Sequence, residues 1–194
     1  MMKKIFSILL LTIVMVGCDA SKSLSGAYNM INCKYDYRSI SGLTISGMNL
    51  SNGISAAYIP RITSILTGSA TSIPLDFTIN LDVNNPNQSA AIFNGMSYIL
   101  NIDGVQFTTG SVNHSMNIAA GQTQNLPLTV GVDLAALMKN ESKDAVTNIA
   151  KNFLGIGSKK SEVNLQIKPT FMIGNVPVQS PVYIPVSFSF GGGK

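Results

Sequence analysis

The sequence predicts a mainly β protein, an antiparallel β-sandwich with one amphipathic helix and one short helix. Three observations lead to this fold class. Apolar and polar residues alternate along several segments, turn residues separate these segments at short intervals, and the apolar period lengthens to three and four residues in one later segment. Because the strands alternate instead of running continuously apolar, antiparallel pairing is favoured over a parallel sheet.

The strand pattern is clearest from Leu75 to Val83, where every second residue is apolar. One apolar face and one polar face are typical of a half-buried strand. Gly47 interrupts a similar alternation and predicts a β-bulge, and Pro185 predicts that the last strand is an edge strand or begins there. The predicted strands are 28–37, 43–50, 73–83, 91–101, 105–109, 115–119, 125–132, 163–173 and 182–190.

Two segments have helical periodicity. Pro60 and Gly68 bracket a short helix, since proline suits the first turn of a helix and glycine the position just past its end. Asp133 can cap a longer helix that runs to about Leu154, with Gly155 as its left-handed end. The apolar stripe of this longer helix predicts that it packs on the sheet. The stripe consists of Leu134, Leu137, Met138, Ala145, Ile149 and Phe153.

The N-terminus has the pattern of an export signal. Lys3 and Lys4 precede an apolar run at 5–16, which is shorter than the roughly 20 residues of a membrane-spanning helix. The ending Met15-Val16-Gly17-Cys18 resembles a bacterial lipobox, although leucine is commoner where Met15 stands. We therefore predict a signal peptide at 1–17, a lipid-anchored tether at 18–26 with Cys18 acylated, a folded domain at 27–190 and a flexible tail at 191–194.

These segments predict a location in the cell envelope. The lipid on Cys18 would bind the protein to a membrane, and an outer membrane with the domain facing the periplasm is favoured over the inner membrane. The formal net charge is only +4, and Lys3 and Lys4 lie in the predicted signal peptide. Such a small charge gives no long-range attraction to nucleic acid, so no nucleic-acid partner is predicted.

The composition argues against an enzyme, and we predict no catalytic residue, metal or cofactor. One histidine, His114, and one cysteine besides Cys18 cannot form the usual zinc ligand sets. We expect His114 in a surface loop and Cys33 as a small buried residue, with a reactive thiol or an intermolecular bridge as the alternative for Cys33. Asp82 and Asp103 could approach each other across a hairpin, but two solvated turn residues are the preferred interpretation.

A family resemblance begins at Asp82 and ends at Val132. It rests on the turn Asn85-Pro86-Asn87, the strand that leads into the hairpin dipeptide Asp103-Gly104, and the later segments 118–123 and 126–130. This pattern resembles the late embryogenesis abundant (LEA) type 2 family, also called the WHy domain. Residues 85–87 and 103–104 are interpreted as structural turns, and a ligand contact at 85–87 is the alternative.

The resemblance implies a fibronectin III or immunoglobulin-like sandwich and, for some members, a link to desiccation and stress tolerance. No chemistry is established for this family. We therefore expect a non-enzymatic, membrane-anchored envelope lipoprotein that protects envelope proteins under desiccation or osmotic stress by surface binding. The alternative is an accessory binding module of an envelope complex that handles polysaccharide or lipid.

Overall fold

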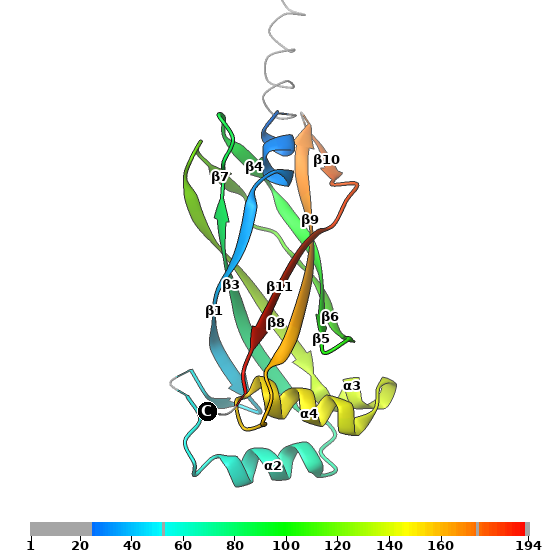
Figure 1. Ribbon diagram of the computed structural model, residues 1–194. Helices are drawn as coiled ribbons and strands as arrows, with labels where there is room; N and C mark the ends of the chain where they lie inside the picture. The colour runs from blue at the N-terminus through cyan, green and yellow to red at the C-terminus, as the bar shows by residue number, and fades with distance from the viewer. Residues whose placement is uncertain (1–24, 52, 174, 193–194) are drawn as a thin grey trace, which may run out of the picture.

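Two antiparallel sheets run along the long axis of the molecule (Figure 1). The computed structural model describes residues 25–51, 53–173 and 175–192. The first sheet has the strand order β2 (Met48–Asn49), β1 (Lys34–Ile45), β3 (Pro74–Asn84) and β8 (Thr123–Asp133). The second has the order β10 (Val176–Gln179), β9 (Ser161–Ile173), β5 (Gly95–Ile102) and β6 (Val105–Val112), and β11 (Ile184–Phe190) also pairs with β9. A small third sheet pairs β4 (Ala91–Phe93) with β7 (Met116–Ile118).

The hydrophobic core lies between the two large sheets. The apolar residues of β3 are almost fully buried, and those of β9 from Val163 to Phe171 face them. The sheets also meet at their sides. On one side the Tyr37 ring of β1 stacks on the Phe188 ring of β11 at 4.0 Å, and on the other the Tyr98 hydroxyl of β5 donates to the Thr129 carbonyl of β8 at 3.2 Å. The sheets therefore curl around one core.

This arrangement confirms the mainly β, antiparallel class, since every strand pairing in the described ranges is antiparallel. The assignment to a fibronectin III or immunoglobulin-like type stays a prediction. The last strand is an edge strand that contains Pro185, because β11 is paired only with β9.

Three helices lie at one end of the sheets, and a helical segment at 25–31 lies at the other (Figure 1). The short helix expected between Pro60 and Gly68 is α2 (Ile59–Thr67), which buries Ile62 and Leu66. The single helix expected from Asp133 to Leu154 is wrong. The chain forms α3 (Leu134–Asn140) and α4 (Lys143–Phe153), because extended backbone at Glu141 ends the first helix and Ser142 caps the second. Gly155, with φ of 75°, follows α4 in the left-handed conformation expected of it.

Several strand predictions are corrected by the structure. Residues 25–31 are helical, so the strand expected at 28–37 begins only at Lys34. Gly47 does not make a bulge. It forms a hairpin turn with Ser46, and both residues have positive φ, as a two-residue turn between twisted strands requires. The strand expected at 91–101 is divided at Asn94, and its first part, β4, joins the small third sheet. Strand β10 was not predicted.

Asp133 joins the first sheet to α3. Its Oδ1 atom accepts hydrogen bonds from the backbone amides of Ala135 and Ile73, both at 2.9 Å, and its Oδ2 atom accepts one from the Ser72 hydroxyl at 2.7 Å. The bonds from Ile73 and Ser72 stabilise the charged form and lower the pKa of the carboxyl below its ordinary value of 3.8. The carboxylate is thus both a helix cap and a clamp on the segment before β3.

Replacing this cap should weaken the fold in a pH-dependent way. We expect Asp133→Ala to lower the free energy of unfolding by about 1 kcal/mol near neutral pH. Because the folded-state pKa is depressed, the stabilisation is present above pH 3.8 and is lost as the pH falls through the folded-state value. Urea titrations at several pH values would measure the free energy of unfolding. The control is Asp36→Ala, which replaces an exposed aspartate. A difference from wild type that persists unchanged in acid would contradict the role of the charge.

Candidate functional site

The Asn85 side chain is fully buried, and hydrogen bonds occupy both ends of its amide. The Nδ2 atom donates to the carbonyl oxygens of Ile118 at 2.8 Å, Ser89 at 3.0 Å and Ala119 at 3.2 Å. The Oδ1 atom accepts from the backbone amide of Asn87 at 3.0 Å and from its side-chain amide at 2.7 Å. This one side chain therefore closes the turn after β3 and joins it to the end of β7.

The same network holds the helical segment 25–31 on the sheets. The Asn87 amide donates to the Asn29 carbonyl at 2.9 Å, and the Asn29 amide donates to the Ser89 hydroxyl at 2.7 Å. From β1, the Tyr35 hydroxyl donates to the Met30 carbonyl at 2.8 Å. Burial, with a smaller contribution from the nearby Cys33 thiol, keeps the pKa of Tyr35 well above its ordinary value, so this hydroxyl stays a donor. The Asn-Pro-Asn turn thus positions the first helix.

An apolar hollow lies between this helical segment and the end of β9 and β10. Its volume is about 660 Å³, within the roughly 300–1,000 Å³ of small-molecule sites. Apart from Ser25 and Gln179 the lining is apolar. The apolar lining residues are Ala27, Tyr28, Ile31, Phe171, Ile173, Val178 and Pro181.

The hollow continues the core face of the second sheet. In the β9–β10 pair, Val178 lies opposite Phe171 and Val176 opposite Ile173, so these four side chains share one face. Phe171 is buried, but Val178 is 39% exposed and Val176 is 61% exposed. Tyr28, on the helical side, is 67% exposed. The apolar face therefore extends beyond the part of the core that the protein itself covers.

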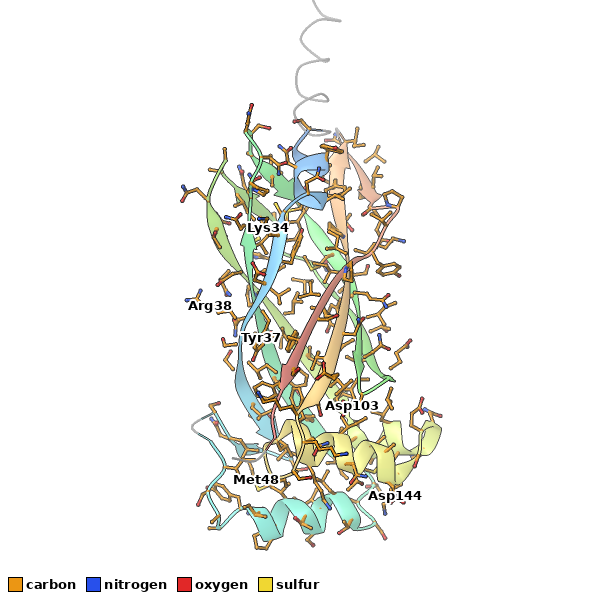
Figure 2. The ribbon with its side chains drawn as sticks, viewed as in Figure 1. Lys34, Tyr37, Arg38, Met48, Asp103 and Asp144 are labelled. Atoms are coloured by element: carbon orange, nitrogen blue, oxygen red, sulfur yellow. The ribbon has the colours of Figure 1, made fainter. Side chains whose placement is uncertain are left out.

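The other predicted turn lies far from this hollow. Asp103 and Gly104, with φ of 50° and 82°, form the turn between β5 and β6, and Figure 2 shows Asp103 toward the end that carries α2, α3 and α4. The Asp103 carboxylate accepts a hydrogen bond from the Glu162 amide at 2.8 Å. Asp82 lies in the first sheet, where it pairs with Arg38 at 3.3 Å. The two aspartates that could have met across a hairpin belong to different sheets.

The remaining sequence candidates do not gather at the hollow. Cys18 and residues 1–24 lie outside the described part of the chain. Cys33 is buried, and burial raises the pKa of its thiol to about 11, so it is mostly a thiol at neutral pH. His114 is exposed in the loop between β6 and β7. Among the residues that the structure describes, no group of three or more His, Cys, Asp or Glu side chains could hold a metal ion, and no helix is both long and apolar enough to span a membrane.

Sequence reasoning missed the hollow because it did not find β10. The available signal was the apolar spacing of Val176 and Val178, which repeats that of Phe171 and Ile173 in the preceding strand. Two prolines, Pro177 within this segment and Pro181 just after it, favoured a turn region instead. The pairing with β9 overrides that local preference.

The two antiparallel sheets curled around one core define a mainly β protein. The chain belongs to the LEA_2 family, described as late embryogenesis abundant protein, whose pattern matches residues 80–182. This range includes both predicted turns and the hollow's β9–β10 side. It excludes the helical segment 25–31, strand β1 and strand β11.

Three solved structures give weaker likenesses, each under 20% identical to this chain. A crystal structure of a protein from Archaeoglobus fulgidus is 16% identical with a TM-score of 0.39. The match covers 79% of this chain and 97% of the chain of that protein. A solution structure of a protein from Arabidopsis thaliana is 15% identical with a TM-score of 0.41, and the match covers 66% of this chain and 77% of that protein's chain. The solution structure of a protein described as late embryogenesis abundant (LEA) is 13% identical with a TM-score of 0.40, covering 98% and 87%. The comparison with curated proteins found no match.

Removing the buried amide should destabilise the end of the domain that carries the hollow. We expect Asn85→Ala to lower the free energy of unfolding by about 2–3 kcal/mol, because several buried backbone groups lose their partner. Asn84→Ala is the matched control, since the Asn84 amide donates only to the exposed Thr123 hydroxyl, and it should cost under about 1 kcal/mol. Chemical denaturation measures both, and amide exchange at 25–31 should accelerate only in Asn85→Ala. Equal effects of the two substitutions would refute the role assigned to Asn85.

Proposed function

We propose that the protein is a non-enzymatic lipoprotein of the cell envelope, anchored through an acylated Cys18. In this proposal its LEA_2 domain protects envelope proteins under desiccation or osmotic stress by surface contact. The main supporting observation is the position of the helical segment 25–31 at one end of an elongated domain (Figure 1). Only six residues separate Cys18 from Ser25, so a lipid on Cys18 would present the domain end-on to the membrane.

The nature of the candidate site favours binding over catalysis. The hollow offers apolar contact area, and its lining holds only one hydroxyl, one phenol and one amide side chain. General acid–base catalysis requires a positioned group that titrates near the working pH. An exposed apolar surface of this kind is typical of an interaction site.

We place the domain in the periplasm on the outer membrane, in preference to the inner membrane. The lipobox-like ending at Cys18 supports attachment to a membrane, and fractionation distinguishes the outer membrane from the inner one. The first test is whether Cys18 carries the lipid.

We expect cells grown with labelled palmitate to label the wild-type protein and the Cys33→Ser variant, but not Cys18→Ser. Globomycin, which blocks cleavage of lipoprotein signal peptides, should cause the larger precursor to accumulate. Membrane fractionation of the same cells identifies the membrane. Palmitate incorporation into Cys18→Ser, or a wild-type protein that stays unlabelled, would contradict the proposed anchor.

The protective role predicts a phenotype. A deletion strain should survive drying and osmotic shock less well than wild type, and the wild-type gene should restore survival more fully than Cys18→Ser. Crosslinking in intact cells should capture many weak partners. Unchanged survival together with no protection of client proteins in vitro would count against this role, and one reproducible stoichiometric partner would favour an accessory module of a lipid- or polysaccharide-handling complex.

A further inference from the structure

We propose that the end of the domain around the hollow docks on the bilayer, with phospholipid acyl chains in contact with Tyr28, Val176 and Val178. This inference goes beyond attachment through a lipid, because it makes the folded domain itself a membrane-binding surface. It rests on the proposed anchor at Cys18 for its location, but its physical basis is the surface of the described residues.

The first argument is the apolar face itself. Val176 and Val178 continue the core face of the second sheet past the point where other elements cover it, and they remain 61% and 39% exposed. Across the hollow, Tyr28 is 67% exposed on the helical segment. Tyrosine suits the boundary between acyl chains and headgroups, because its ring is apolar and its hydroxyl can stay in water.

The second argument is the length of chain between this surface and the anchor. Ser25 lines the hollow and follows Cys18 by seven positions. Seven residues span at most about 25 Å even when fully extended. Whatever path the intervening residues take, an acylated Cys18 would hold the hollow within that distance of the membrane surface.

The third argument is the distribution of charge. Among the described residues, no carboxylate lies between Lys34 and this end of the domain. The first carboxylates beyond Lys34 along the strands are the facing pair Asp36 and Asp82. Figure 2 shows Lys34 toward the end with the helical segment 25–31, and Asp103 and Asp144 toward the other end. The described residues at this end therefore add no like-charge repulsion toward anionic headgroups.

The fourth argument favours lipid over an added β-strand. The outer edge of β10 carries Pro177, which has no amide donor, and proline on an edge strand lowers its capacity to pair with another strand. The side chains of β10 remain available for apolar contact, which has no directional requirement. A fluid bilayer supplies such contact without a complementary shape.

The test uses the absence of tryptophan from the sequence. Tyr28→Trp places a single indole beside the hollow, and Tyr58→Trp places one beside α2 at the opposite end, where Tyr58 is 41% exposed. The lipidated full-length mature protein is reconstituted in vesicles of phosphatidylethanolamine and phosphatidylglycerol, with or without phosphatidylcholine brominated on its acyl chains. We expect brominated lipid to quench the emission of Tyr28→Trp several-fold more than that of Tyr58→Trp.

A second pair of variants tests the apolar contact. Adding Val176→Glu to Tyr28→Trp should remove most of the quenching, because a charged side chain then faces the acyl region. Adding Ile59→Glu, on the exposed surface of α2, should leave it unchanged. Both residues are exposed, so neither change disturbs the core. Quenching that is equal in Tyr28→Trp and Tyr58→Trp, or insensitive to Val176→Glu, would overturn the proposal.

Flotation of the same samples separates docking from anchoring. Protein that floats with the vesicles but shows no preferential quenching of Tyr28→Trp would overturn docking and leave the anchor standing. Protein that fails to float is not held on the vesicles by its anchor. In that case the tryptophan emissions of Tyr28→Trp and Tyr58→Trp are compared after an excess of vesicles is added. Quenching confined to Tyr28→Trp would still support docking, and no quenching would overturn it.

Discussion

The buried amide of Asn85 is the interaction on which one end of this protein depends. A polar side chain with no exposed surface is stable only when its donors and acceptor are paired, and here both ends of the amide are occupied. Its partners come from the turn after β3 and from the end of β7, and the Asn85 backbone adds two further links, to the carbonyl of Gln122 and from the amide of Gly121. Through Asn87 and Ser89 the same network reaches Asn29, so a requirement of hydrogen bonding at one residue determines where the first helix lies.

The two ends of the sheets are completed in different ways. At one end α4 closes the core: the Phe153 ring packs between Phe77 and Phe190 at centroid distances of 4.8 and 4.9 Å. At the other end a short helical segment covers only part of the interior, and the face of β9 and β10 extends beyond it. The hydrophobic effect is roughly proportional to area, so the uncovered face is where further burial would be favourable. Tyr28, Val176 and Val178 are thus exposed at the end that carries Ser25, toward the predicted anchor.

The sequence predicted the parts of this fold that local patterns determine. Strict alternation in β3 and the Pro60 and Gly68 pair that brackets α2 were sufficient, because one buried face or one helix boundary requires particular residue types at particular spacings. The errors lie where tertiary contacts decide. Residues 25–31 have no strong helical period, and their helix is held by Asn87 and Tyr35 from distant strands. The break at Glu141 and Ser142 has weak local signals, and β10 exists because β9 supplies its hydrogen bonds. The hollow depends on both of these segments, so its position could not be predicted from the chain alone.

The exposed part of β10 also limits what can cover it. Natural edge strands usually carry charge, proline or a bulge that prevents association. This one has Pro177, which weakens strand pairing, but Val176 and Val178 still present apolar side chains to solvent. Such a surface disfavours pairing with another strand, which needs backbone hydrogen bonds. It permits apolar contact between side chains and a partner, which needs only apolar area. A protein partner would have to match the shape of the hollow, whereas acyl chains adapt to it. The combination of a protected backbone edge and an unprotected side-chain face therefore favours a fluid apolar phase as its neighbour.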